Sequence, residues 1–180
     1  MTTTPALIAL TGLPGAGKTA LAHATAALAR AAGIDVRILS RDDVRHVLFA
    51  PCDWTDDEKL TAYEAMLGGA CHHLERQRWV LLEGMPFSRR REVDAIRVIA
   101  PEFGAVPIIV DCAIAPDVAA ARIAADADDH HGREDGIASP DIVNAHREPL
   151  DPDITIDMTQ PRDACAVELF AELQRRASDA

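Results

Sequence analysis

The sequence predicts an α/β domain with a parallel sheet of about five strands and helices on both faces. Two observations lead to this fold class. Short apolar runs alternate with amphipathic helical patterns along the chain, and a glycine-rich loop joins the first run to the first helix. The chain has 180 residues, 48% of them hydrophobic, which is enough for one buried core. We therefore expect residues 1–180 to form one domain.

The strands are predicted from short apolar runs, because a strand covered on both faces carries apolar side chains at most positions. These runs place strands near residues 6–11, 36–40, 79–83, 106–111 and 154–157.

The helices are predicted from apolar residues at helical spacing. One pattern follows the glycine-rich loop and ends at Gly33. A long one spans Leu60 to Leu74, another ends at Pro101, a fourth follows Pro116, and the last starts after Asp163. A polar segment near residues 126–139, rich in aspartate, histidine and glycine, is predicted to be a mobile lid.

The loop Gly12–Thr19 matches the phosphate-binding pattern G-x-x-x-x-G-K-[ST] at every fixed position. The expected nucleotide ligands are its glycines and the residues around them, namely Gly12, Gly15, Ala16, Gly17, Lys18, Thr19 and Ala20. Lys18 is also expected to act catalytically at the β and γ phosphates, while the Thr19 hydroxyl would ligate Mg²⁺. The motif therefore predicts ATP and Mg²⁺ as cofactors and a P-loop NTPase-type three-layer fold, with a chance glycine-rich turn as the alternative.

Acidic residues end two of the predicted strands, where ligands bind in open parallel sheets. Asp42 is the first choice to orient or deprotonate an attacking hydroxyl, and Asp43 is the second. We expect one of the two to cap a helix and the other to face the substrate. Glu83 is predicted to bind a substrate hydroxyl or an Mg²⁺-bound water, and a purely structural hydrogen bond is its alternative.

Three arginines complete the predicted site. Arg45 lies one helical turn after the acidic pair, so it would bind either that pair or an anionic substrate. Arg122 and Arg133 flank the lid and are expected to bind the nucleotide, with Arg122 also stabilising charge during phosphoryl transfer. The alternative for both is an ordinary surface arginine.

The bulk composition excludes some classes of partner. A net charge of −11 argues against nucleic acid as a partner, because nucleic-acid binding requires a basic surface.

The widely spaced cysteines suit a reducing compartment, and we expect a cytoplasmic protein that neither spans nor binds a membrane. The histidine pairs lack the partners of a metal site. The oligomeric state stays open, with a homodimer included.

Three segments resemble P-loop small-molecule kinases, and the adenylylsulfate kinases in particular. Residues 39–48 are similar to that family's L-D-G-D-N-[IL]-R-H-G-L, so Asp42 falls on the catalytically placed Asp and Arg45 on the substrate-side Arg. Residues 86–91 resemble S-P-[YF]-x-x-x-R, and residues 147–153 resemble Y-E-x-P-x-x-P. The resemblance implies an ATP-dependent kinase of a hydroxyl group.

Two departures concern the acceptor. In the family's R-x-E-N-I-R-R run, Lys59 stands at the position of the first arginine, and the asparagine and both later arginines are absent. The family's F-T-G segment is missing around residues 136–138. We therefore expect a small-molecule hydroxyl substrate other than adenylylsulfate. Adenylylsulfate kinase itself, a polynucleotide or tRNA kinase, and a nucleotide-dependent switch or ATPase without an acceptor are the alternatives.

Overall fold

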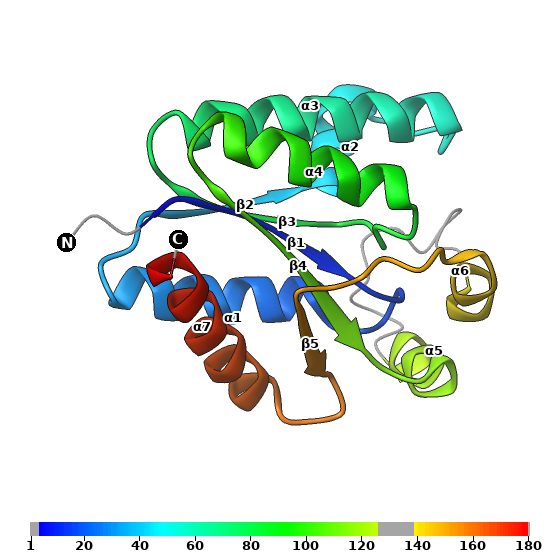
Figure 1. The fold of residues 1–180 in the computed structure, drawn as a ribbon. Coiled ribbons are helices and arrows are strands. Elements are labelled where there is room, and N and C mark those ends of the chain that lie inside the picture. The colour runs from blue at the N-terminus through cyan, green and yellow to red at the C-terminus, as the bar shows by residue number, and fades with distance from the viewer. Residues whose placement is uncertain (1–3, 126–138, 180) are drawn as a thin grey trace.

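The computed structural model describes residues 4–125 and 139–179, and five parallel strands form a single sheet in this part of the chain. The strand order is β2-β3-β1-β4-β5 (Figure 1). The strands are β1 (Ala6–Thr11), β2 (Val36–Ser40), β3 (Trp79–Glu83), β4 (Val106–Ala113) and β5 (Ile154–Asp157). The predicted α/β fold with five parallel strands is confirmed, and β4 extends two residues beyond its expected end.

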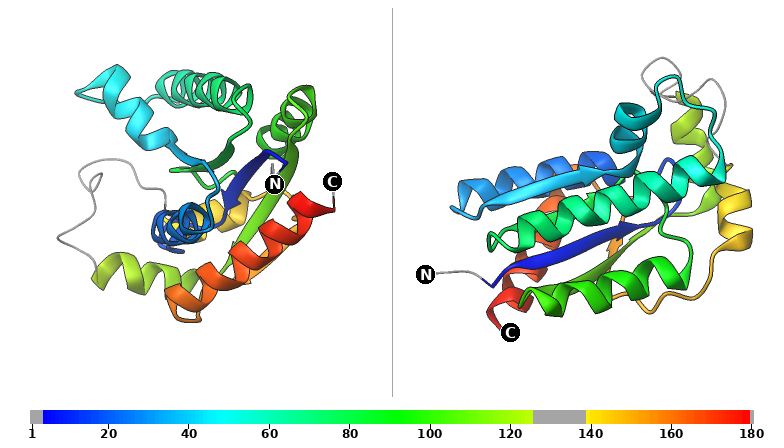
Figure 2. Two further views of the ribbon diagram at one scale, coloured as in Figure 1. Left: turned by 90° about the vertical axis from the view of Figure 1, so that its left-hand side faces the viewer. Right: turned by 90° about the horizontal axis from the view of Figure 1, so that it is seen from above.

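Helices cover both faces of this sheet, as Figures 1 and 2 show. The helices are α1 (Lys18–Ala31), α2 (Arg41–Phe49), α3 (Asp56–Leu74), α4 (Arg90–Glu102), α5 (Pro116–Ala125), α6 (Pro140–His146) and α7 (Arg162–Ser178). Helices α1 and α7 pack on one face, and α3 and α4 pack on the other. Helices α5 and α6 lie beyond the carboxyl ends of the strands (Figure 1).

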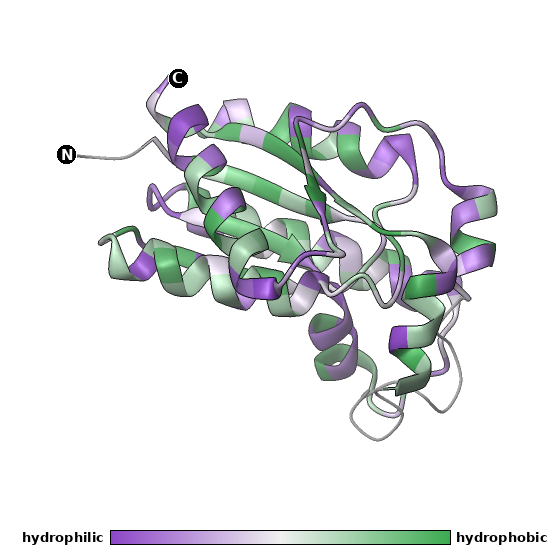
Figure 3. Cartoon of the chain, turned by 90° about the horizontal axis from the view of Figure 1, so that it is seen from below, coloured by the Kyte–Doolittle hydropathy of each residue, from purple (hydrophilic) through white to green (hydrophobic). Residues whose placement is uncertain are grey.

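Strand β1 explains why the core has two halves. Every residue of β1 is buried, and successive side chains point to opposite faces of the sheet. Ile8 and Leu10 pack with α1 and α7, whereas Leu7 and Ala9 pack with α3 and α4. Figure 3 shows the hydrophobic colouring along the strands and the hydrophilic colouring on the outer surfaces of the helices. The continuous apolar run in the sequence is thus the consequence of burial on both faces.

Two helix predictions need correction, and one helix was not predicted. Helix α4 runs through Pro101 and ends at Glu102. It is followed by the C-cap Phe103 and by Gly104, whose φ is 64° and whose N–H donates to the Pro101 carbonyl. Pro101 is the second-last residue of α4, so the hydrogen bond lost with its N–H is one at the very end of the helix. Helix α7 begins one residue before Asp163. The seven-residue α6 was not predicted.

The predicted lid near residues 126–139 falls outside the described residues, except for Ser139, which precedes α6. Arg133 lies in the same segment and is likewise outside them. Within the described residues, no helix is long and apolar enough to cross a membrane. All four cysteines are described, and each is a free thiol.

Candidate functional site

The glycine-rich loop runs from the end of β1 into α1 and has a left-handed backbone at three of its glycines. The φ angles are 137° at Gly12, 79° at Gly15 and 91° at Gly17. A Cβ at Gly12 would lie 2.8 Å from the Cys112 carbonyl oxygen, and one at Gly15 would lie 2.5 Å from that of Ala119. These glycines therefore satisfy both the backbone conformation and the close packing of the loop.

Lys18 begins α1 and folds back over the loop. Its Nζ donates hydrogen bonds to the carbonyl oxygens of Gly12, at 3.0 Å, and Leu13, at 2.9 Å. Burial lowers the pKa of the Lys18 amine below its ordinary value, although the nearby carboxylates of Glu83 and Asp42 oppose this shift. A group with further negative charge at the loop would therefore favour the protonated amine.

Thr19 and Glu83 lie side by side at the mouth of the loop. The Thr19 hydroxyl donates to Glu83 Oε2 at 2.6 Å, and the Glu83 side chain comes from the carboxyl end of β3 with only 3% of the residue exposed. Sequence reasoning placed these two residues in one site, and the structure brings them into direct contact. Both offer oxygen atoms, which are the ligands that Mg²⁺ prefers.

Thr19 and Glu83 are the candidate Mg²⁺ ligands in the described part of the cleft. No group of three or more histidine, cysteine, aspartate or glutamate side chains that could hold a metal occurs within the described residues. The oxygen atoms of Thr19 and Glu83 fit Mg²⁺, because Mg²⁺ usually keeps several waters and takes the rest of its ligands from phosphates and one or two protein oxygens.

Asp42 and Asp43 lie in the first turn of α2, but neither caps this helix. Ser40 is the N-cap, and its hydroxyl accepts a hydrogen bond from the Asp43 N–H at 3.4 Å. The expectation that one aspartate is the cap is therefore wrong. Serine and aspartate are about equally good N-caps, and the extended backbone of Ser40 at the end of β2 makes it the residue that precedes the first turn. Asp43 is exposed at the edge of the cleft.

Asp42 is bound by two arginines. Arg41 Nη2 donates to Asp42 Oδ1 at 2.8 Å, and Arg45 Nη2 donates to the same oxygen at 3.1 Å. Of the partners that the sequence left open for Arg45, the structure shows a contact with one member of the acidic pair, Asp42. Arg45 is 2% exposed and stacks on the Trp54 ring, with its Cζ 3.7 Å from the ring centroid.

Arg122 in α5 contacts the loop from the opposite side. Its Nη1 donates to the Ala16 carbonyl at 3.3 Å, and its Nη2 donates to the Met158 carbonyl at 2.7 Å. The guanidinium group thus bridges the glycine-rich loop and the turn after β5. Arg122 is a partly buried residue fixed by main-chain contacts, which differs from the free surface arginine considered as its alternative.

One open cleft of about 1760 Å³ contains most of the predicted site. The predicted residues among its lining are Gly15, Ala16, Gly17, Lys18, Thr19, Ala20, Asp42, Asp43, Arg45, Glu83 and Arg122. Gly12, the first residue of the loop, is not part of this lining. The cleft extends from the loop and Arg122 to the side chains of α2, α3 and the start of α4.

Sequence reasoning missed several residues of this cleft. Trp54, Tyr63 and Glu92 line its far end, and the Tyr63 hydroxyl donates to the Glu92 carbonyl at 3.0 Å. Burial raises the pKa of the Glu92 carboxyl. Arg41 is missed as well, although it stands in the segment that carries the family resemblance. Trp54 had a signal of its own, since it is one of only two tryptophans and lies in a polar stretch just before a helix.

A second cluster of polar groups lies behind the loop. Arg147 Nη2 donates to Asp111 Oδ1 at 2.6 Å and to the Thr11 hydroxyl at 3.1 Å. Thr11 and Asp111 are paired across β1 and β4 in the parallel register. This cluster ties the segment after α6 to the carboxyl ends of two central strands, next to the loop.

The fold, the loop and the Thr19–Glu83 contact together define a P-loop domain with the architecture of the small-molecule kinases. The model of the AAA domain family matches residues 7–139, and the chain belongs to this family. The predicted resemblance to P-loop small-molecule kinases is thereby confirmed for family and fold. No curated protein matches the sequence.

Solved structures share the fold over almost the whole chain. The APS kinase CysC of Mycobacterium tuberculosis, in complex with AMPPNP and APS, aligns with a TM-score of 0.74 at 20% identity, over 95% of this chain and 98% of that one. A gluconokinase from Sinorhizobium meliloti aligns with a TM-score of 0.57 at 18% identity, over 97% and 96%. The hexameric APS kinase of Thiobacillus denitrificans aligns at 0.68 and 18% identity, over 98% of this chain and 30% of that one.

Proposed function

We propose that the protein is an ATP- and Mg²⁺-dependent kinase that transfers the γ-phosphoryl group to a hydroxyl of a small molecule. One observation carries this proposal. The Thr19–Glu83 hydrogen bond sits beside the amine of Lys18, and the carboxylate of Asp42 faces the same cleft. Groups suited to a triphosphate and a carboxylate suited to a hydroxyl are therefore within one cavity, which phosphoryl transfer requires.

The loop would bind the phosphates through its main-chain N–H groups and Lys18. The Lys18 amine donates to two carbonyl oxygens, and burial lowers its pKa. Phosphate oxygens would offer it stronger, charged acceptors and would stabilise its protonated form. Thr19 and Glu83 would hold Mg²⁺, directly or through a water. When bound, this ion neutralises charge that develops on the phosphate oxygens.

Arg122 would hold the nucleotide from the side of α5. Its contacts with the Ala16 and Met158 carbonyls support a nucleotide-binding role, because they place a guanidinium group against the loop. A role in stabilising charge during transfer stays a prediction, as do the roles of Arg133.

Asp42 would orient the acceptor hydroxyl or take its proton. The described hydrogen bonds of its side chain all go to Oδ1, which leaves Oδ2 for a ligand, and 49% of the side chain is exposed. A carboxylate in this position aligns the attacking oxygen with the phosphorus atom. Asp43 is the second candidate, as the sequence predicted.

The acceptor is proposed to be a small molecule. The cleft must hold a nucleotide and an acceptor together, and the net charge of −11 disfavours nucleic acid.

The free thiols of all four cysteines support the expectation of a reducing, cytoplasmic compartment.

A screen of hydroxyl compounds with γ-labelled ATP and Mg²⁺ tests the proposal. The panel includes sugars, sugar acids, adenylylsulfate and a 5′-hydroxyl oligonucleotide, and the control is Lys18→Ala. We expect label to be transferred to a small alcohol by the intact protein only. Hydrolysis of ATP that no alcohol changes, with no labelled product, would instead support an ATPase or a switch.

A further inference from the structure

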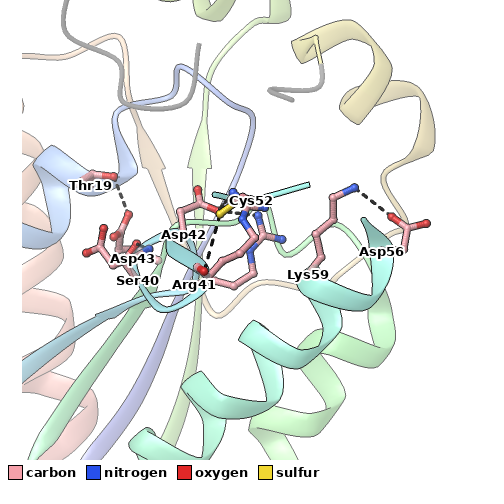
Figure 4. A network of polar contacts seen from close by, with 10 residues as sticks. Thr19, Ser40, Arg41, Asp42, Asp43, Cys52, Asp56 and Lys59 are labelled. Atoms are coloured by element: carbon pink, nitrogen blue, oxygen red, sulfur yellow. Dashed lines mark hydrogen bonds and ion pairs between the residues drawn. The ribbon is translucent and has the colours of Figure 1, made fainter. Parts of the chain in front are cut away.

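The two arginines on Asp42 determine which of its oxygens is left for a ligand. Both guanidinium groups donate to Oδ1, so the carboxylate cannot rotate without breaking two charge-assisted hydrogen bonds. The orientation of Asp42 therefore depends on where the arginines are held. Figure 4 shows Asp42 and Arg41 together at the start of α2, near Thr19.

Arg45 is held by Trp54. The Arg45 side chain is 2% exposed, and its Cζ lies 3.7 Å from the centroid of the Trp54 ring, a short cation–π contact. Arg45 Nε is buried with no hydrogen-bond partner among the described residues. The aromatic face is therefore a principal contact of this buried cation, besides its ion pair with Asp42.

Trp54 is in turn held by Glu58 from α3. The backbone of Trp54 has a φ of 61°, which a bulky residue adopts only when its surroundings impose it. Glu58 supplies this constraint, because its carboxylate accepts the Trp54 N–H at 2.8 Å and the Asp53 N–H at 3.0 Å. Glu58 is itself 9% exposed, and its N–H donates to the Thr55 hydroxyl that caps α3.

The geometry points to Trp54 and Glu58 as positioning residues that fix the Asp42 carboxylate through Arg45. A buried carboxylate holds the strained tryptophan backbone, the indole ring holds the guanidinium group, and the guanidinium group holds Oδ1. The start of α3 thereby sets the geometry at the start of α2. The inference uses the proposed function only for the role of Asp42 in catalysis.

The carboxyl ¹³C signal of Asp42, assigned with Asp42→Asn, tests this chain of contacts without any substrate. Arg45→Met gives the signal of the broken contact. We expect Trp54→Leu and Glu58→Gln to move the signal toward that of Arg45→Met, whereas Trp54→Phe keeps an aromatic face and leaves the signal in place. The matched control is Asp57→Asn, which removes an exposed carboxylate beside Glu58 that lies outside the cleft.

Kinetics give a second measurement with any acceptor that the screen identifies. Trp54→Leu should lower kcat by about 10²-fold, the cost of a misplaced reacting group, with the KM for ATP unchanged and with activity recovered in Trp54→Phe. If Trp54 had a merely structural role, Trp54→Leu would lower the stability of the protein without lowering kcat selectively.

Unmoved Asp42 signals in folded Trp54→Leu and Glu58→Gln would overturn the inference. If Trp54→Leu does not fold, Glu58→Gln decides alone, because it keeps the size of the side chain. If no acceptor is found, the proposed function fails, while the carboxyl signals still decide the positioning role.

Discussion

Gly15 and Gly33 offer a matched pair for testing how tightly the phosphate loop packs. Their φ angles are nearly equal, at 79° and 80°. A Cβ at Gly15 would meet the Ala119 carbonyl oxygen at 2.5 Å and the Ile123 side chain at 2.8 Å, whereas a Cβ at Gly33 would meet nothing within 4 Å. Both alanine variants therefore carry the same backbone strain, and only Gly15→Ala adds a collision between the loop and α5.

The magnitudes follow from these two terms. A left-handed alanine costs about 1–2 kcal/mol, which the less flexible unfolded chain offsets by about 0.4–1 kcal/mol. Gly33→Ala should therefore lower the free energy of unfolding by about 1 kcal/mol. Gly15→Ala should cost about 1–3 kcal/mol more, the usual range for overpacking. That excess corresponds to a further fall in Tm of about 2–12 °C for a chain of this size.

Urea unfolding followed by circular dichroism measures the two free energies, and thermal unfolding with ATP and Mg²⁺ measures nucleotide binding. We expect Gly15→Ala to lose stabilisation by the nucleotide and Gly33→Ala to keep it. Equal stabilities in the two variants, with equal nucleotide effects, would refute the close packing of the loop against α5.

Three further predictions concern the cleft. Glu83→Gln should weaken the binding of ATP with Mg²⁺ by about 10–100-fold and leave binding in EDTA unchanged, as measured by calorimetry with Glu92→Gln as the control. Asp42→Asn should lower turnover by about 10²–10⁴-fold with little effect on ATP affinity, and equal losses in both would contradict its role. Burial lowers the pKa of Lys18 in the folded protein. Between this lowered pKa and 10.5, the unfolded chain therefore keeps a proton on Lys18 that the folded protein has lost. The free energy of unfolding should accordingly rise with pH across this range. Unfolding of Lys18→Met across this range should lack that rise, and a Lys18→Met profile identical to that of the intact protein would exclude a lowered pKa for Lys18.

The sheet could be predicted because its central strands are buried on both faces. A short, unbroken apolar run is typical of a strand that helices cover on both sides, and β1, β2, β3 and β5 have the predicted bounds. The phosphate loop was predictable for a related reason, because its glycines are required by the backbone itself.

The end of α4 and the cap of α2 were harder to predict. Pro101 suggested a stop, but the left-handed backbone at Gly104 determines where α4 ends. Ser40, Asp42 and Asp43 are all good caps, so only the end of β2 selects among them. Propensities alone could not resolve either choice.

The end of the cleft near Trp54, Tyr63 and Glu92 could not be predicted. Its contacts depend on how the folded helices bring residues together, and no local sequence pattern indicates them. Arg45 had two equally reasonable partners in the sequence, and its burial beneath Trp54 favours the ion pair with Asp42. No spacing in the sequence indicates that Glu58 accepts the N–H of Trp54. The short α6 has a proline at its start but lies beside a polar segment, so its signal was obscured.

The binding of a nucleotide at the loop is the central claim, and amide NMR spectra measured with a non-hydrolysable ATP analogue and Mg²⁺ test it most directly. We expect the largest shifts at the amides of residues 12–20, Pro14 excepted, and at the Arg122 side chain, with no shifts in Lys18→Ala at the same concentrations. Unmoved loop signals at millimolar analogue, in a protein that is otherwise folded, would contradict the account.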